Sequence, residues 1–224
     1  MRFGGLLANQ NVDMDVFPGE IIGLIGPNGA GKTNFFNCIS GFLRPTEGSV
    51  NFLGNELVGL KPNQICHLGL TRTFQITQPL RGMTVLENLM VGPFCRYPRR
   101  EDAEVRAKEI LHKTGLAAKA DQLASNLTIA ERKRLEIARA LGTEPKLLIL
   151  DETMAGLTPT EVQQAVELVK EIQAGGTTFL IIEHVMEAIM PIADRLYVLD
   201  AGKLIAVGTP EEIVNNPRVI EAYL

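Results

Sequence analysis

One stretch of eight residues, 26–33, constrains the fold of this chain more than any other. It matches the pattern G-x-x-x-x-G-K-[ST]. The run 20–25 before it predicts a buried parallel strand, and Phe35, Phe36 and Ile39 after it stand at helical spacing. A strand, a glycine-rich turn and a helix start in this order predict a phosphate-binding loop, whereas an incidental glycine-rich turn lacks that setting. The loop comprises Gly26, Pro27, Asn28, Gly29, Ala30, Gly31, Lys32 and Thr33.

The residue types in this loop have physical reasons to contact a phosphate chain. Glycines let the backbone curl and turn its N–H groups inward, and the helix N-terminus adds partial positive charge. Lys32 supplies a full charge for the β- and γ-phosphates, and the Thr33 hydroxyl is suited to a Mg²⁺ shell. The sequence therefore predicts that the chain binds a nucleoside triphosphate.

Composition excludes several other classes of protein. A net charge of −4 leaves no basic footprint of the kind that nucleic acid requires, so no nucleic-acid partner is expected. Cys38, Cys66 and Cys95 are odd in number and widely spaced, which argues against a disulfide framework or a zinc site and predicts reduced thiols in a cytosolic protein. The start of the chain is no signal peptide, and no run of 18 apolar residues occurs. Any membrane role is expected to come through a partner.

Hydrophobic patterning predicts an α/β fold with a mainly parallel sheet. Val12, Met14 and Val16 alternate as in a strand with one buried face. Further strands are predicted at 49–53, 70–74, 146–151 and 177–182, with a terminal hairpin of 194–200 and 203–207. Helices are predicted at 84–90, 101–114, 130–141 and 159–174.

The stretch 76–142 has the texture of a helical insertion into this core. Thr84 and Glu87 form a capping-box pattern ahead of its first helix. Its second helix is expected to turn Val105, Ile110 and Leu111 inward. We therefore expect one domain over 1–224, with a core of 1–75 and 143–224, a helical subdomain of 76–142 and a β-rich N-terminal part.

Two carboxylates follow the apolar strand 146–151 at the sheet edge where open α/β sheets bind ligands. Triphosphate hydrolysis requires a carboxylate near Mg²⁺ and a group that orients or deprotonates water. Asp151 is placed for the metal's coordination sphere, and Glu152 for polarising the attacking water. Alone, such a strand end is as readily an ordinary surface exit; the upstream phosphate loop favours the catalytic interpretation.

Three further features agree with this chemistry, each with a plain alternative. Gln75 ends a predicted strand and suits Mg²⁺ or water, but a surface amide is the commoner use. His184 also follows a strand, although a lone histidine is more often structural than catalytic. The turn 127–131 opens a helix with Thr128 at its start; a second phosphate site and an ordinary N-cap explain that spacing equally well.

The order of these motifs resembles the ATP-binding subunits of ABC transporters, and the resemblance covers nearly the whole chain. Within that superfamily the chain is similar to the LivG-like subunits of branched-chain amino acid importers. The stretches that carry this second resemblance are 3–6, 26–33, 39–42, 71–75, 155–157 and 182–184.

The resemblance implies an ATPase that energises import of branched-chain or related amino acids. Two such subunits, identical or different, close head to tail around two ATP molecules with Mg²⁺. Partners then include two transmembrane permease subunits and a periplasmic or extracellular substrate-binding protein, which places the chain on the cytoplasmic face of the membrane. Urea or amide import, lipopolysaccharide export and a soluble ABC ATPase outside transport remain alternatives.

The resemblance also implies roles for single residues. Phe3 would stack on adenine, and Asn34 would extend the phosphate loop. Gln75 would bind the metal with Thr33 and Asp151, and couple the site to the membrane subunits. His184 would sense the γ-phosphate beside the catalytic Glu152. The residues that would face the nucleotide of the partner subunit are Thr128, Ala130 and Glu131.

The chain departs from the family pattern at several positions. The signature loop, usually Leu-Ser-Gly-Gly-Gln, reads Leu-Thr-Ile-Ala-Glu over 127–131. Ile129 and Ala130 narrow the room in which a phosphate can approach the backbone, and Glu131 adds a negative charge near that polyanion. That charge is unfavourable unless a neighbour such as Arg132 or Lys133 neutralises it. Thr158 and Asn34 also replace the usual residues, and the chain begins about one strand later than most relatives. An asymmetric dimer, in which a different partner supplies an ordinary signature loop, would accommodate these departures.

Overall fold

A six-stranded sheet forms the centre of the computed structural model, which describes residues 1–3, 6–73, 79–80 and 82–223. The strand order is β10-β9-β3-β8-β7-β6. Neighbouring strands run parallel except for β9 and β10, which form an antiparallel hairpin, so the predicted α/β class is confirmed. The strands are β3 (Ile21–Ile25), β6 (Leu70–Arg72), β7 (Leu147–Asp151), β8 (Thr178–Ile182), β9 (Arg195–Asp200) and β10 (Lys203–Gly208).

The strand register brings three chain segments to one edge of the sheet. Asp151 at the end of β7 is opposite Ile182 at the end of β8. Leu24 of β3 is opposite Ile182 on the other side of β8. Because parallel strands end at the same edge, the loop after β3 and the residues after β7 and β8 leave the sheet side by side.

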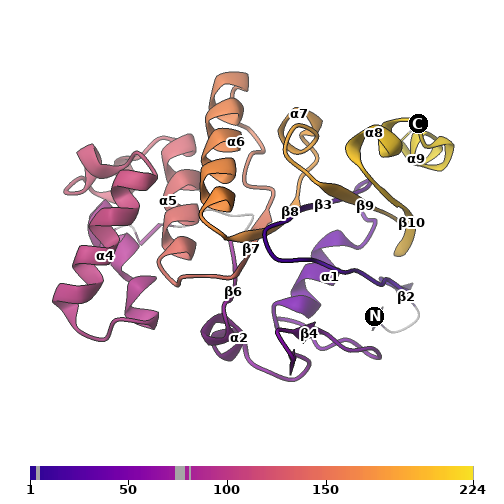
Figure 1. The fold of residues 1–224 in the computed structure, drawn as a ribbon, viewed down its shortest axis with the longest axis horizontal. Helices are drawn as coiled ribbons and strands as arrows, with labels where there is room; N and C mark the ends of the chain where they lie inside the picture. Colours follow the sequence, from indigo (N-terminus) through magenta and orange to yellow (C-terminus); the bar gives the residue numbers. More distant parts are fainter. Residues whose placement is uncertain (4–5, 74–78, 81, 224) are drawn as a thin grey trace.

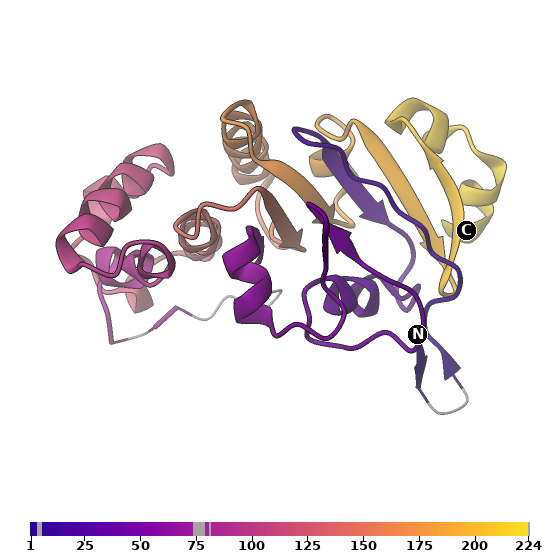
Figure 2. The same cartoon turned by 60° about the horizontal axis from the view of Figure 1, so that its bottom comes forward.

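Helices cover both faces of the sheet (Figure 1, Figure 2). On one face, α1 (Lys32–Ile39) and α2 (Pro62–Leu68) pack on a cluster that contains Ile22, Leu24 and Phe36. On the other face, a larger cluster contains Ile21 and Ile25. The helices that contribute to it are α3 (Val85–Met90), α4 (Arg100–Lys113), α5 (Ile129–Leu141), α6 (Pro159–Ala174), α7 (Met186–Ile189), α8 (Pro210–Val214) and α9 (Pro217–Tyr223).

The helices α3, α4 and α5 gather at one end of the molecule (Figure 1). Buried side chains on α4 include Ala103, Ala107, Ile110 and Leu111. The prediction for Val105 was wrong: it is 60% exposed, because two helical residues from Ala103 turn it about 200° away from the buried stripe. These helices share one hydrophobic cluster with the sheet, and a separate helical subdomain over 76–142 remains our proposal.

The N-terminal part contains less strand than its pattern predicts. The alternating stretch 12–16 is not a strand, although Val12, Met14 and Val16 pack half-buried against the α1 face of the sheet. Side chains replace a neighbouring strand there, since the Tyr197 hydroxyl accepts the Asp15 N–H and Arg195 donates to the Asp15 carbonyl. Short antiparallel pairs complete the region, namely β1 (Arg2–Phe3) with β2 (Leu6–Leu7) and β4 (Asn51–Phe52) with β5 (Asn55–Glu56).

Candidate functional site

The predicted phosphate loop lies between β3 and α1, and two of its three glycines are sterically required. Gly26 has φ 148°, and a Cβ there would lie 2.0 Å from the Leu199 carbonyl oxygen. Gly31 has φ 97°, and a Cβ there would lie 2.4 Å from the Ala8 carbonyl oxygen. Both positions combine a left-handed backbone with close approach of another main chain, which only glycine tolerates. The loop is thus fixed against β9 and the N-terminal segment.

Lys32 begins α1 and folds back over the loop. Its Nζ donates to the carbonyl oxygens of Gly26 at 2.6 Å and Pro27 at 2.9 Å, and the side chain is buried. Burial lowers the pKa of Lys32, while the nearby carboxylates of Glu152 and Asp151 act in the opposite direction. An ammonium held in this way sits at the loop with acidic groups beside it.

Asp151 forms a buried ion pair that the sequence analysis did not find. Arg72 Nη2 donates to Asp151 Oδ2 at 2.6 Å, and the two side chains are 6% and 2% exposed. Arg72 Nη1 also donates to Asn37 Oδ1 at 2.6 Å and to Ser40 Oγ. The other oxygen, Asp151 Oδ1, is buried without a hydrogen-bond partner among the described residues. The signal for this pair was a basic residue inside the predicted strand 70–74.

Glu152 and His184, predicted as catalytic neighbours, leave adjacent strands and meet at the edge of the sheet. His184 Nδ1 lies 3.9 Å from Glu152 Oε1. Glu152 adopts a left-handed φ of 49°, which is uncommon for a residue with a side chain. Its N–H donates to the Ile182 carbonyl at 2.9 Å, and Lys133 Nζ donates to its carbonyl oxygen at 3.4 Å. Contacts with β8 and α5 therefore hold the strained peptide that carries the Glu152 carboxylate.

A second buried carboxylate, that of Glu183, directly follows β8 and was also missed. It is 1% exposed, and its Oε1 accepts the Met154 N–H at 2.7 Å. Burial raises the pKa of Glu183 to about 7, against the opposing effects of the Met154 N–H and of Lys133. Lys133 also donates to the Ala155 carbonyl. Glu183 and Lys133 thus both bind the main chain of the loop after β7. A glutamate that directly follows an apolar strand was the signal that could have revealed it.

The turn at the start of α5 is an N-cap whose polar groups bond to one another. Thr128 Oγ1 accepts the Glu131 N–H at 3.3 Å, and Glu131 Oε2 accepts the Thr128 N–H at 2.9 Å. Glu131 pairs with Lys119, whereas the expected partners Arg132 and Lys133 donate to main-chain carbonyls elsewhere. Burial alone would raise the pKa of Glu131, but hydrogen bonds from Lys119 and Thr128 outweigh it and lower that pKa.

Several predicted site residues lie apart from this cluster or outside the described part of the chain. Among the described residues, no hydrogen bond or ion pair joins the turn of Thr128, Ala130 and Glu131 to the phosphate loop. Gln75 lies outside the described residues, as does the side chain of Phe3, whose backbone belongs to β1. Thr158, one of the departures from the family pattern, caps α6.

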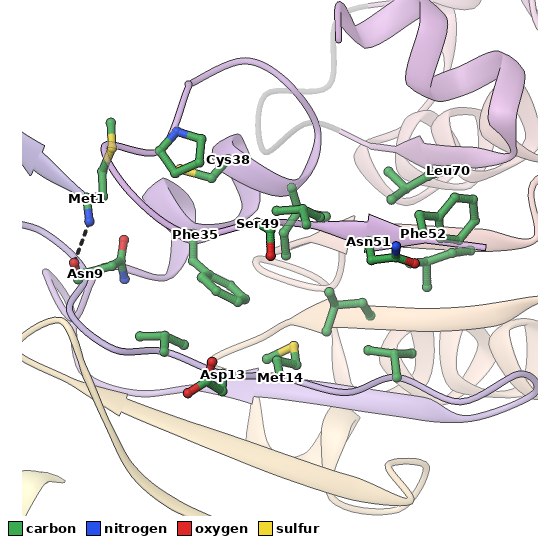
Figure 3. A pocket seen from close by; sticks show the side chains of 18 of the residues that line it. Met1, Asn9, Asp13, Met14, Phe35, Cys38, Ser49, Asn51, Phe52 and Leu70 are labelled. Carbon is green, nitrogen blue, oxygen red and sulfur yellow. Dashed lines mark hydrogen bonds between the residues drawn. The ribbon is translucent and has the colours of Figure 1, made fainter. Parts of the chain in front are cut away.

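A pocket of about 1090 Å³ lies on the α1 face of the sheet (Figure 3). Met14, Phe35, Ser49 and Phe52 are among its lining residues. Residues 26–33 and 151–152 do not line it, so it is separate from the predicted chemistry. Within the described ranges, no group of three or more His, Cys, Asp or Glu side chains is arranged to hold a metal ion, and no helix has the length and apolarity to cross a membrane.

Family profiles match this chain at two places. The profile described as "ABC transporter" matches residues 9–155, more than half of the chain. The profile described as "Branched-chain amino acid ATP-binding cassette transporter" matches residues 203–224.

Curated relatives are similar over essentially the full length. The high-affinity branched-chain amino acid transport ATP-binding protein LivG of Escherichia coli K12 is 46% identical over 240 aligned residues, covering 100% of this chain and 94% of the relative. A probable LivG of Archaeoglobus fulgidus is 42% identical, and the match covers 99% of this chain and 91% of that relative. BraF of Pseudomonas aeruginosa, also named for branched-chain amino acid transport, is 40% identical, covering 100% and 94%.

Solved structures of similar fold are ATP-binding cassettes. A nucleotide-free cassette from an ABC transporter superposes with a TM-score of 0.91 at 34% identity, covering 100% of this chain and 95% of that one. The ADP conformation of another cassette superposes with a TM-score of 0.91 at 35% identity, covering 100% of this chain and 94% of that one. A dimeric cassette bound to ADP and phosphate superposes with a TM-score of 0.83 at 23% identity. The match covers 94% of this chain and 94% of that one, which indicates a shared fold.

Proposed function

Because this chain belongs to the ABC transporter family of ATP-binding cassettes, we propose that it energises import of branched-chain amino acids. It is an ATPase subunit that binds ATP. One observation carries the choice of cargo: 46% identity over the whole chain to a LivG protein named for that transport. The match of its last residues to a branched-chain amino acid cassette profile favours the same cargo over urea, amides or lipopolysaccharide.

We assign the hydrolytic roles to residues at the common edge of the sheet. The N–H groups of the phosphate loop and Lys32 bind the β- and γ-phosphates. Glu152 orients and polarises the attacking water, and His184, within 3.9 Å of it, contacts the γ-phosphate. Catalysis then consists of positioning and charge stabilisation, as expected for phosphoryl transfer. Lys133 and Glu183 position the peptide of Glu152.

A Mg²⁺ ion fits the acidic residue at the end of β7. Asp151 Oδ1 is a buried oxygen without a hydrogen-bond partner in the described part of the chain, while Arg72 occupies Oδ2. Thr33, at the start of α1, is an exposed residue that carries a hydroxyl, and oxygen atoms are the ligands that Mg²⁺ prefers. Bound Mg²⁺ supplies neutralisation of phosphate charge. Gln75 remains part of this proposed ligand set.

Cassettes of this fold dimerise and form part of transporter complexes. For this chain we propose a companion cassette, two permease subunits and an extracytoplasmic binding protein. The permease subunits hold the chain at the inner face of the membrane. The altered turn at Thr128 supports an asymmetric dimer. The cap of α5 already uses the N–H groups of Thr128 and Glu131, so this turn has few donors left for the partner's nucleotide. A companion cassette with an ordinary signature loop would complete the other site, which contains Glu152.

The variant Glu152→Gln tests the hydrolytic assignment. In the assembled transporter we expect turnover to fall by about 10²–10⁴-fold because the group that polarises water is lost. ATP binding, measured with a fluorescent analogue, should persist. Glu187→Gln, an exposed change on α7, is the matched control and should keep normal turnover. Normal hydrolysis by Glu152→Gln would remove Glu152 from the mechanism.

Cargo is tested in proteoliposomes that contain the chain with its companion cassette and permease. Labelled leucine, isoleucine and valine should accumulate in an ATP-dependent manner when the binding protein is present. Urea serves as the comparison solute. Uptake of urea without uptake of the three amino acids would reject the proposed cargo while leaving the ATPase assignment intact.

A further inference from the structure

Two cysteines from different parts of the chain lie in contact near the surface. Cys66 belongs to α2, and Cys95 ends the short helix η1 (Pro93–Cys95), which follows α3. Their Sγ atoms are 3.9 Å apart, and both residues are half-buried. We propose that Cys66 and Cys95 form a reversible disulfide, a modification site that joins α2 to η1. This inference does not rest on the proposed function.

The surrounding contacts keep the two thiols together. Arg96, next to Cys95, donates to the carbonyl oxygens of Cys66 and His67 at the end of α2, and to that of Thr143 after α5. A disulfide needs its sulfurs about 2.05 Å apart, so they must close by roughly 2 Å. Both cysteines lie in short helical segments of seven and three residues, so side-chain rotation with a small local shift can supply that movement.

A histidine beside the pair, His67, can accept the proton of the Cys95 thiol. His67 Nδ1 lies 3.5 Å from Cys95 Sγ, within reach of its proton. Burial, and then the neighbouring Cys66, raise the pKa of the Cys95 thiol. Cys95 therefore holds its proton near neutral pH, and His67 is the group placed to accept it. The third cysteine, Cys38 of α1, is buried and is absent from this cluster.

A peroxide is the oxidant class that balances the reaction. The Cys66 thiol gives up its proton as its sulfur attacks one peroxide oxygen and the O–O bond breaks. The departing oxygen takes up that proton and leaves as water, and Cys66 becomes a sulfenic acid. Cys95 Sγ then attacks the Cys66 sulfur while His67 takes the Cys95 proton. The S–O bond breaks, and the sulfenic oxygen leaves as water with the proton that His67 passes on. Two thiols lose two electrons and two protons in total, and one hydrogen peroxide becomes two waters.

Intact-mass measurement of the purified full-length chain tests this directly. After brief treatment with hydrogen peroxide, the protein is denatured and labelled with N-ethylmaleimide. We expect one adduct, on Cys38, in place of three, and a peptide that contains Cys66 joined to Cys95. Dithiothreitol should restore all three adducts. The bridge closes a loop of about 30 residues, so oxidation should raise Tm by roughly 5–10 °C.

Matched serine variants separate this site from general oxidation. Cys38→Ser should retain the bridge, whereas Cys66→Ser and Cys95→Ser should each lose both the bridge and the rise in Tm. Three adducts on the treated wild-type chain would overturn the proposal. So would a bridge that includes Cys38, a bridge between two molecules, or sulfinic acid at Cys66 without bridging. The wild-type peptide map decides the question even if a serine variant folds poorly.

Discussion

Buried and half-buried carboxylates in this molecule are balanced by cations from other elements. Arg72 of β6 pairs with Asp151 of β7, and Lys119 pairs with Glu131 at the start of α5. Neither pair has a local spacing that sequence periodicity can reveal, because the partners meet only after the elements pack. The residue types at the site were predictable, whereas their neutralising partners were not.

The charge of Glu131 matters to the proposed partner site. In Glu131→Gln, the amide can keep the bond to the Thr128 N–H, while Lys119 loses its counter-charge. A turn with one more net positive charge should attract the partner's triphosphate, and the apparent KM for ATP of the assembled transporter should fall about threefold to tenfold.

Steady-state ATPase assays at fixed salt measure this change. Glu161→Gln, which alters the same capping-box position on α6, is the control and should leave the KM where it is. An unchanged KM in Glu131→Gln would mean that this turn does not face nucleotide.

Arg72 offers a second prediction for a single residue. Arg72→Met leaves the carboxylate of Asp151 buried without its cation, which should reduce the free energy of unfolding by about 3–5 kcal/mol. Urea unfolding followed by circular dichroism provides the value. The double variant Arg72→Met/Asp151→Asn should recover part of the loss, because the uncompensated charge is gone. Equal losses in the single and double variants would contradict a charge-based cause.

At the scale of elements, strong local signals were reliable and weak ones were not. Buried strands such as β7 and capped helices such as α3 follow from continuous apolar runs and N-cap patterns. The stretch 12–16 has the alternation of a strand but lacks a ladder, since side chains of β9 take the place of a neighbour. Strand pairing depends on distant segments, so period alone could not decide it.

The ends of β7 and β8 make stability depend on pH through Glu183. Its pKa is raised from 4.5 to about 7 by burial, so the unfolded chain releases this proton first. The stabilising effect of the proton is fully present below pH 4.5 and is lost as pH rises to about 7, by on the order of 3 kcal/mol.

Glu183→Gln tests this dependence, because the amide can still accept the Met154 N–H but does not titrate. Urea unfolding at several values between pH 5 and pH 8 should show a flatter pH dependence than the wild type. Glu187→Gln should follow the wild-type curve. Parallel slopes for wild type and Glu183→Gln would assign the pH dependence to other groups.

At the scale of the whole molecule, the order of elements and the location of the phosphate loop were predictable from sequence. The shared hydrophobic cluster of α3, α4 and α5 with the sheet was not, because it depends on how the layers stack. The role of the signature turn was also beyond the sequence, since the residues that would face it belong to another subunit.

The asymmetric dimer is a prediction about assembly. The chain alone should bind ATP, remain monomeric and turn over slowly, because its altered turn gives a poor partner site. Addition of a companion cassette with an ordinary signature loop should produce an ATP-dependent heterodimer and restore turnover. Light scattering and ATPase assays follow the two properties. An active homodimer with ordinary turnover would reject asymmetry.

The left-handed backbone of Glu152 has a consequence for how this protein can evolve. Glycine or asparagine would adopt the φ of 49° more readily and would relieve strain at that peptide. Selection for a longer-lived fold therefore favours their codons at this position, while selection for transport, under the proposed role, retains glutamate. A substitution that makes the fold more stable at this residue therefore gives a protein that, under the proposed role of Glu152, binds nucleotide but no longer drives transport.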